Sequence, residues 1–141
     1  MIVDDDTILR EFHNTRIKEH IPAQYFINQH NLLIKRHSFL AKYSKWRRLN
    51  SLPFVNLDVT QYLQWMEKHY NMPIGEDIYN HNIITSDTIF QPLTTAATIF
   101  ITLYPKLTTE VLRDCGLTSV SFNNCRKHIL QQGINLHAPT Y

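Results

Sequence analysis

Residues Thr108–Asn135 read TTEVLRDCGLTSVSFNNCRKHILQQGIN, and no other run in the chain is as informative. If Thr108 is position 1 of a helix-turn-helix unit, Gly116 falls at position 9, where the backbone must be left-handed and a Cβ would be strained. The apolar residues at positions 4, 8, 10, 15 and 18 would hold the two helices together; they are Val111, Cys115, Leu117, Phe122 and Cys125. This spacing predicts two short helices joined by a tight turn.

One position departs from that pattern. Position 5 usually carries a small residue because the two helices approach closely there, and this chain has Leu112. A wider crossing angle could accommodate the leucine. Alternatively, the segment is an ordinary αα corner in a helical core, because any two amphipathic helices around a glycine turn give part of the same pattern.

Length and composition restrict the classes of protein. The chain has 141 residues, 43% of them hydrophobic and 18% charged, which suits one domain or two very small ones with a real core. Only three glycines are present, and neither GxGxxG nor GxxxxGK[ST] occurs. We therefore expect no nucleotide cofactor, and no other cofactor is indicated.

The charge is small overall but unevenly distributed. The formal net charge is +2. No carboxylate follows Asp114, and that stretch carries Arg126 and Lys127. A second segment without acids holds six cations: Lys35, Arg36, Lys42, Lys45, Arg47 and Arg48. Such local positive potential attracts phosphate, although a solvated helix face without a partner is the alternative.

Neither the cysteines nor the long uncharged segment indicates a metal site or a membrane span. Cys115 and Cys125 fall at inward positions, so we interpret them as reduced core residues rather than as a disulfide or zinc ligands with His128 and His137. Residues 88–105 lack charge but contain five threonines and two prolines, which favours a buried element over a membrane span. No signal sequence opens the chain, so we expect a cytoplasmic protein of a bacterium or phage.

The periodicity predicts a mainly α-helical fold. Asp58, with Gln61 three residues later, is typical of a helix N-cap. Pro73, Gly75 and two asparagines make residues 71–91 irregular, with a short β-hairpin expected within 78–91. Helices are expected over residues 7–20, 22–49 (with a break allowed), 59–70, 93–104, 109–115 and 119–132. The threonine and isoleucine content of 93–104 leaves a strand as the alternative there.

Three regions follow from these elements. Residues 1–72 would form a helical N-terminal region for packing or dimerisation, 73–92 an irregular connection, and 93–141 a helix-turn-helix-like DNA-binding unit. The aromatic residues of 22–49 and 59–70 could line a homodimer interface, since such units commonly bind paired half-sites, or they could form the monomer's own core.

The end of the chain resembles a known motif. Within residues 118–136, nine positions are similar to the C-terminal motif of the filamentous-phage replication initiator family, often labelled II/X: Ser121, Phe122, Arg126, Ile129, Leu130, Gly133, Ile134, Asn135 and Leu136. The same run resembles the second helix of bacterial helix-turn-helix regulators. The resemblance implies a DNA-binding or regulatory segment without the family's nicking chemistry, and Tyr43–Tyr70 resembles, more weakly, the helical arm of tyrosine recombinases.

The sequence therefore predicts a transcriptional or replication regulator that binds double-stranded DNA. No nucleophile elbow or paired-carboxylate site is present, so neither catalysis nor a small-molecule substrate is expected. The second helix, Ser119–Gln131, would enter the major groove, and the basic segment would add phosphate contacts. The expected contacts are Thr118, Ser119, Ser121, Asn123, Asn124, Arg126 and Lys127, with Lys35, Arg36, Lys42, Lys45, Arg47 and Arg48. The alternative is a protein–protein interaction module, such as an adaptor or inhibitor of a host complex.

Overall fold

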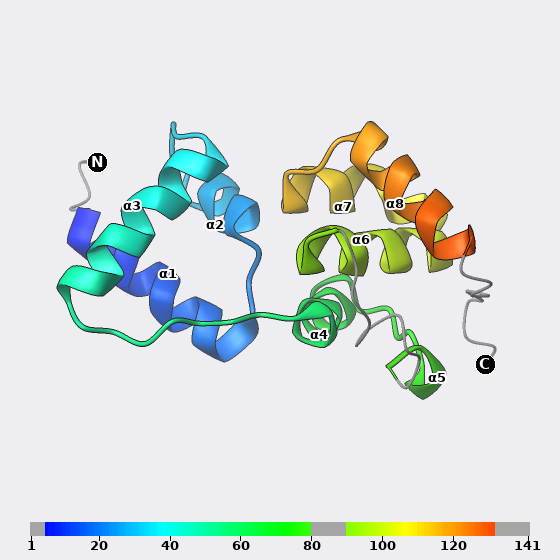
Figure 1. Ribbon diagram of the computed structural model, residues 1–141, viewed down its shortest axis with the longest axis horizontal. Helices are drawn as coiled ribbons and strands as arrows, with labels where there is room; N and C mark the ends of the chain where they lie inside the picture. The colour runs from blue at the N-terminus through cyan, green and yellow to red at the C-terminus, as the bar shows by residue number, and fades with distance from the viewer. Residues whose placement is uncertain (1–4, 80–89, 132–141) are drawn as a thin grey trace.

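The computed structural model describes residues 5–79 and 90–131. Every regular element in these ranges is a helix, which confirms the mainly α fold class (Figure 1). The expected hairpin falls mostly on residues outside the described ranges. The elements are α1 (Asp5–Glu19), α2 (Ala23–Gln29), α3 (Arg36–Leu49), α4 (Val59–Tyr70), α5 (Glu76–Tyr79), α6 (Pro92–Leu103), the 3₁₀ turn η2 (Pro105–Leu107), α7 (Thr108–Cys115) and α8 (Ser119–Gln131).

Helices α1, α2 and α3 form an N-terminal lobe around the ring of Phe12. That ring has no exposed surface, and its centroid lies 5.1 Å from Phe26, 4.9 Å from Phe39 and 4.9 Å from Tyr43. The expected helix over 22–49 is broken between α2 and α3. Asn31 adopts a φ of 53° there, a left-handed conformation that asparagine tolerates better than most residues and that ends a helix.

Helix α6 is the centre of the C-terminal lobe. It contacts α4, α7 and α8, and it is buried on every side, as is expected of a helix that is apolar all round. Its threonines tolerate burial because their hydroxyls donate to carbonyls one turn earlier, Thr98 to Thr94 and Thr102 to Thr98, each at 2.7 Å. The uncharged segment is thus a buried helix where it is described. No helix among the described residues has the length and apolar character needed to cross a membrane.

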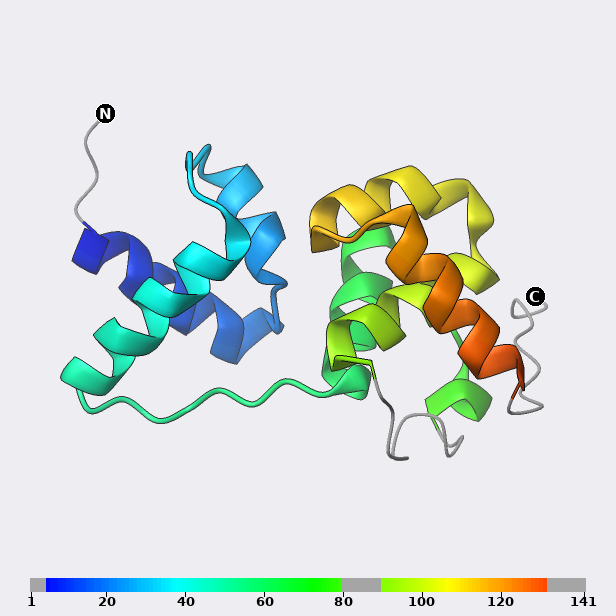
Figure 2. The ribbon, with the colours of Figure 1, turned by 45° about the horizontal axis from the view of Figure 1, so that its top comes forward.

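The boundary between the lobes differs from the expected grouping of residues 1–72. Helix α4 packs mainly on α6, and its Leu63 and Met66 side chains are completely buried. The chain therefore passes from one lobe to the other along residues 50–58, before α4, as an extended strand-like connection (Figure 2). The predicted capping box is confirmed: Gln61 N–H donates to Asp58 Oδ1 at 2.9 Å, and Asp58 N–H donates to Gln61 Oε1 at 2.9 Å.

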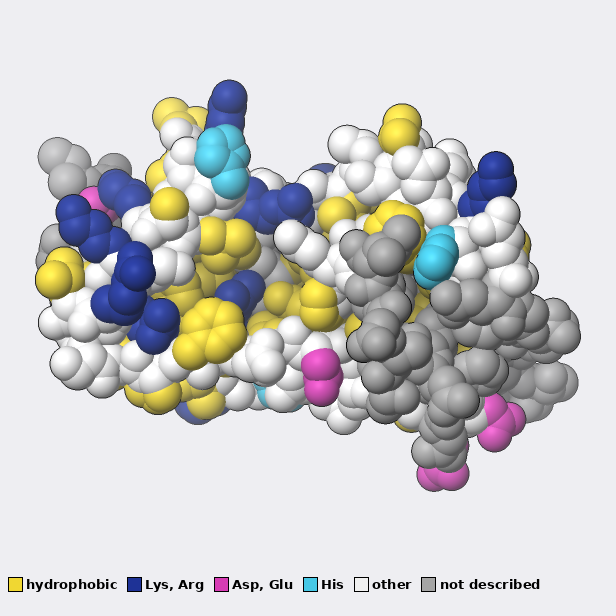
Figure 3. Space-filling view, viewed as in Figure 1, with side chains coloured by type: hydrophobic (Ala, Val, Ile, Leu, Met, Phe, Trp, Pro, Cys, Tyr) yellow, Lys and Arg dark blue, Asp and Glu magenta, His cyan; other side chains and the backbone are white. Residues whose placement is uncertain are grey.

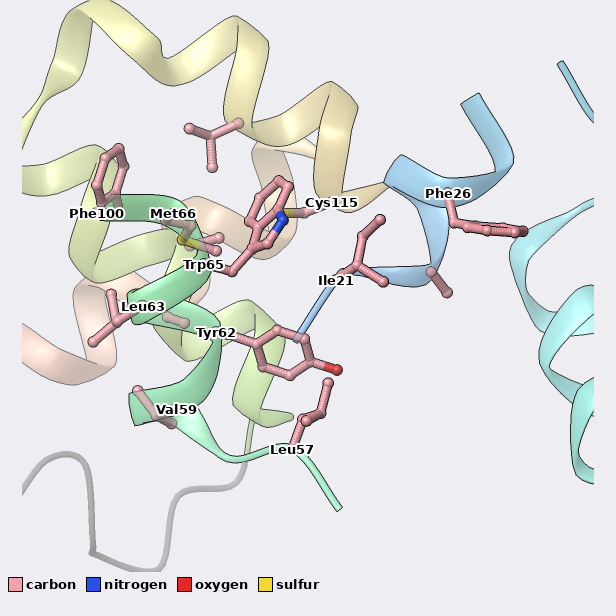
Figure 4. Close-up of a cluster of buried hydrophobic side chains, with 14 of the residues drawn as sticks. Ile21, Phe26, Leu57, Val59, Tyr62, Leu63, Trp65, Met66, Phe100 and Cys115 are labelled. Atoms are coloured by element: carbon pink, nitrogen blue, oxygen red, sulfur yellow. The ribbon is translucent and has the colours of Figure 1, made fainter. Parts of the chain in front are cut away.

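The two lobes meet where α2 packs on α7. Arg36, at the start of α3, donates from Nη1 to the Cys115 carbonyl at 2.5 Å, and Asn28 donates to the Arg113 carbonyl at 3.4 Å. Figure 4 shows Ile21 and Leu57 from the two connections beside Tyr62 of α4. Side chains from both lobes therefore share one continuous core.

Most of the aromatic residues proposed as a dimer interface lie inside the chain's own core, and Tyr25 and Tyr70 are partly buried against it. In α3, Phe39, Tyr43 and Trp46 are each less than 10% exposed, and in α4 so are Tyr62 and Trp65. These side chains are therefore unavailable for dimer contacts without unfolding. A homodimer would therefore need another surface. The homodimer itself stays a prediction.

Candidate nucleic-acid interface

The turn between α7 and α8 is built as the sequence spacing requires at Gly116. Gly116 has a φ of 71°, and its N–H donates to the Arg113 carbonyl at 3.3 Å. Leu117 N–H donates to the Leu112 carbonyl at 2.9 Å. These two bonds form a Schellman motif, which commonly places apolar residues at the positions that Leu112 and Leu117 occupy. Both leucines are partly buried against the core, so Leu112 has a structural role in the helix ending.

Helix α8 begins at a threonine cap and is amphipathic. Ser121 N–H donates to Thr118 Oγ1 at 3.1 Å, which satisfies one of the free N–H groups of the first turn. Phe122, Cys125 and Ile129 are buried on the side that packs on α6. The apolar spacing predicted from the sequence thus fixes which side of α8 faces inward.

The opposite side of α8 is exposed and carries no carboxylate. Of the expected contacts, Ser121 is half-buried and takes part in the cap, whereas six side chains are exposed: Thr118, Ser119, Asn123, Asn124, Arg126 and Lys127. Val120 and Leu130 are exposed on the same helix. A shallow open depression on this side is lined by Asn123, Arg126, Lys127, Leu130 and Gln131.

Arg126 is partly held by its own helix. Its guanidinium carbon lies 5.2 Å from the centroid of the Phe122 ring, and its Nη2 donates to Asn123 Oδ1 at 3.4 Å. The arginine stem therefore covers the edge of the core while the charge stays at the surface. Asn124 and Lys127 have no such restraint among the described residues, so both can reorient toward a ligand.

The basic segment around α3 divides into two groups. Arg36 binds the Cys115 carbonyl, Lys42 pairs with Asp5 at 3.0 Å, and Arg47 donates to the Leu52 carbonyl at 3.0 Å. These three stabilise the fold locally. The exposed cations that remain at the surface are Lys35, Lys45 and Arg48, the last of which also donates to the Ser44 carbonyl within α3.

The two basic regions do not form one surface. Helix α3 packs on α2, α2 packs on α7, and α7 leads into α8, so α3 and α8 lie in opposite lobes. In Figure 3 the Lys and Arg side chains gather over the N-terminal lobe, and a smaller group lies near α8 at the far edge, with other residues between them. The structure brings the α8 residues together but does not join them to the α3 cations.

The inner side of α7 carries a charged residue that the apolar spacing did not identify. Asp114 is 4% exposed, accepts from the Tyr70 hydroxyl at 2.6 Å, and accepts from Arg113 Nε at 3.2 Å. Burial and this carboxylate together raise the pKa of Tyr70 far above its ordinary value, so Tyr70 stays a donor. Asp114 lies one turn after Val111, on the inward side. Its spacing from Val111 is therefore the sequence signal that could have predicted its burial.

Both cysteines are buried and free. Burial raises the pKa of the Cys115 thiol well above its usual range, so it is neither a reactive thiolate nor a ready metal ligand. Across residues 5–79 and 90–131, no three His, Cys, Asp or Glu side chains gather closely enough to hold a metal. His137 of the zinc set considered from the sequence lies outside the described residues.

Comparisons with protein-family models, with curated proteins and with solved structures find no match for this chain. The resemblance to the phage initiator motif stays a prediction, and its residues Gly133–Leu136 lie outside the described ranges. What the chain binds is therefore inferred from the surface of its described helices.

Proposed function

We propose that the chain is a DNA-binding regulator that inserts α8 into the major groove of double-stranded DNA. The observation that carries the proposal is the exposed side of α8, where amides, hydroxyls and cations stand without any carboxylate. A helix used in this way must be fixed on one side and free on the other. Packing of Phe122, Cys125 and Ile129 on α6 supports the first condition, and the exposure of Asn123 and Asn124 supports the second.

Each exposed group on α8 has a chemical role under this proposal. The amides of Asn123 and Asn124 can each pair with an adenine edge through two hydrogen bonds, and Lys127 can reach a guanine or a phosphate. Thr118 and Ser119, at the helix start, can contact backbone phosphates close to the positive end of the helix dipole. Lys35, Lys45 and Arg48 lie in the other lobe, so they could contact only phosphates that are away from the groove occupied by α8.

The first test is the salt dependence of binding to generic duplex DNA. A protein that neutralises about six phosphates should lose about 10³-fold in affinity between about 50 and about 200 mM salt. Fluorescence anisotropy with a labelled duplex measures this directly. A dissociation constant that hardly changes across this range, or no binding at the lower salt, would contradict the proposal.

The second test separates base contacts from general attraction to phosphate. The double variant Asn123→Ala with Asn124→Ala removes two amides without changing charge, so it should relax sequence preference in a selection from random duplexes while stability is kept. Asn14→Ala with Asn56→Ala is the matched control, because both residues are exposed and distant from α8. Equal preference in the two double variants would argue against α8 as the contact helix.

A second candidate function, a protein–protein interaction module, is favoured by one feature of the N-terminal lobe. An open cavity of about 590 Å³ between α1 and α3 is lined by apolar residues that include Ile8, Leu9 and Ile34, and Leu33 at its rim is fully exposed. A cavity with an apolar lining and an exposed leucine at its edge offers a partner protein a place to bury an apolar side chain. Absence of DNA binding at low salt would favour this candidate.

A further inference from the structure

A small cleft between the two lobes brings two arginines together. It has a volume of about 100 Å³ and lies among residues of α1, α3, α4 and the start of α6. Arg16 and Arg36 both line it, and both are half-buried. The remaining lining is neutral: Ala23, Leu40, Leu57, Tyr62, Gln91, Pro92 and Leu93.

Neither guanidinium is neutralised within the described residues. Neither Arg16 nor Arg36 takes part in an ion pair among the described residues, and no Asp or Glu lines the cleft. Arg36 uses Nη1 for the Cys115 carbonyl, whereas Arg16 has a buried Nε without any hydrogen-bond partner. A guanidinium offers five N–H donors, and a buried donor without a partner destabilises the folded protein.

The hydroxyl of Tyr62 completes the surroundings of the cleft. Tyr62 is 8% exposed, and Figure 4 shows its hydroxyl pointing from α4 toward the N-terminal lobe. Burial raises the pKa of Tyr62, and the positive charges of Arg16 and Arg36 both act in the opposite direction. Arg16, Arg36 and Tyr62 all line the same small cleft, so three side chains that can donate hydrogen bonds border one space.

We propose that this cleft, formed by Arg16, Arg36 and the Tyr62 hydroxyl, binds a phosphate group as a tetrahedral oxyanion. Two like charges in a partly desolvated space repel each other. An anion between them offsets that repulsion and accepts hydrogen bonds from the N–H groups that have no partner. Pockets for drug-sized ligands are several times larger, so the cleft admits a phosphoryl group but not a nucleoside. Because residues of both lobes line the cleft, the anion would hold the lobes together.

The test is thermal unfolding of the full chain with increasing orthophosphate, with ionic strength held constant by sodium chloride. At about ten times its Kd, phosphate should raise the Tm of the wild type by about 3–6 °C. Arg16→Gln should abolish this rise. Arg10→Gln is the matched control, because Arg10 lies on the same helix but is half-exposed and pairs with Asp6, and it should keep the full rise.

Several results would distinguish the outcomes. No saturable rise in the wild type, or an equal rise in Arg16→Gln, would overturn the proposal. Arg36→Gln should also lose the rise, but it additionally removes the bond to Cys115, so Arg16→Gln is the decisive variant. Asn123→Ala with Asn124→Ala should keep the rise, which makes the result independent of the proposed DNA contact.

A second arm identifies the source of the phosphate. Duplex DNA is bound by Arg16→Gln and Arg10→Gln under the same low-salt conditions. A loss of affinity confined to Arg16→Gln assigns the cleft to a backbone phosphate of DNA. Equal affinities, together with a phosphate-dependent Tm, assign it to free phosphate.

Discussion

Gly116 and Gly75 both have a positive φ, of 71° and 85°, but only Gly116 is crowded. A Cβ at Gly116 would lie 2.9 Å from Gln24 Cγ and 3.0 Å from Arg36 Nη1, whereas a Cβ at Gly75 would meet nothing within 4 Å. Gly116 therefore serves two purposes, since it ends α7 and lets the N-terminal lobe approach that helix end.

The pair Gly116→Ala and Gly75→Ala separates these two purposes. Both variants should lose about 1–2 kcal/mol of unfolding free energy from the left-handed backbone. Gly116→Ala should lose about 1–3 kcal/mol more, because Gln24 and Arg36 must move. Urea denaturation measures the difference. Equal losses would show that the contact between the lobes does not depend on the missing side chain.

Single residues were predictable where the signal is local. Asp58 and Gln61 make the expected capping box, and the apolar positions Phe122 and Cys125 face inward as the helical period requires. Arg36 was expected to contact phosphate, and that stays a prediction; what the sequence did not indicate is its hydrogen bond to a carbonyl 79 residues away. Such a role depends on the packing of two lobes, and nothing adjacent to Arg36 in the sequence indicates it.

At the scale of elements, α1 and α3 are joined by a buried polar pair. His13 is 4% exposed, and its Nδ1 lies 2.6 Å from the Tyr43 hydroxyl. Burial lowers the pKa of His13 from 6.5, and the positive charges of Arg47 and Arg10 lower it further. The folded protein therefore favours neutral His13, and protonation opposes the packing of α1 on α3.

This pair predicts a loss of stability in acid. Below pH 6.5 the unfolded chain binds a proton at His13 more readily than the folded chain, so the unfolding free energy falls as the pH falls. The loss between pH 7 and pH 5 is limited to about 2 kcal/mol for one such histidine. Chemical denaturation at both pH values measures it.

His13→Gln should lose less unfolding free energy between pH 7 and pH 5 than the wild type, because glutamine at position 13 binds no proton in this range. His37→Gln is the control, because His37 is exposed on α3, and it should follow the wild type. Burial lowers the pKa of His69 as well, and both variants retain that contribution. Equal losses for His13→Gln and the wild type would contradict the account of the α1–α3 contact.

Elements were predictable where period and caps agree. The bounds of α4, α7 and α8 lie within one residue of those expected, and α6 begins at Pro92, where its missing N–H is harmless. The short helix α5 was missed, because four residues give no measurable period. The break between α2 and α3 could not be placed from the sequence. Asn31 takes the left-handed conformation there, and an asparagine marks a helix end less clearly than a glycine does.

At the scale of the whole molecule, packing groups α4 with the C-terminal helices, whereas the sequence grouped residues 1–72 together. Pro73 and Gly75 indicate an irregular connection after α4, but the lobes separate at residues 50–58, because α4 covers one face of the apolar helix α6. Long-range packing of this kind is invisible to local patterns. The same packing separates the α3 cations from α8, so the expected DNA contacts fall on two surfaces rather than one.

Amide chemical-shift mapping of the full chain with a generic duplex at about 50 mM salt would show whether α8 is the helix that contacts DNA. Contact through α8 predicts that, among the described residues, the largest changes fall on the exposed positions of Thr118–Gln131, and that they vanish at about 200 mM salt. Changes confined to α1–α3, or to the residues around Leu33, would contradict it, as would a spectrum that DNA leaves unaltered.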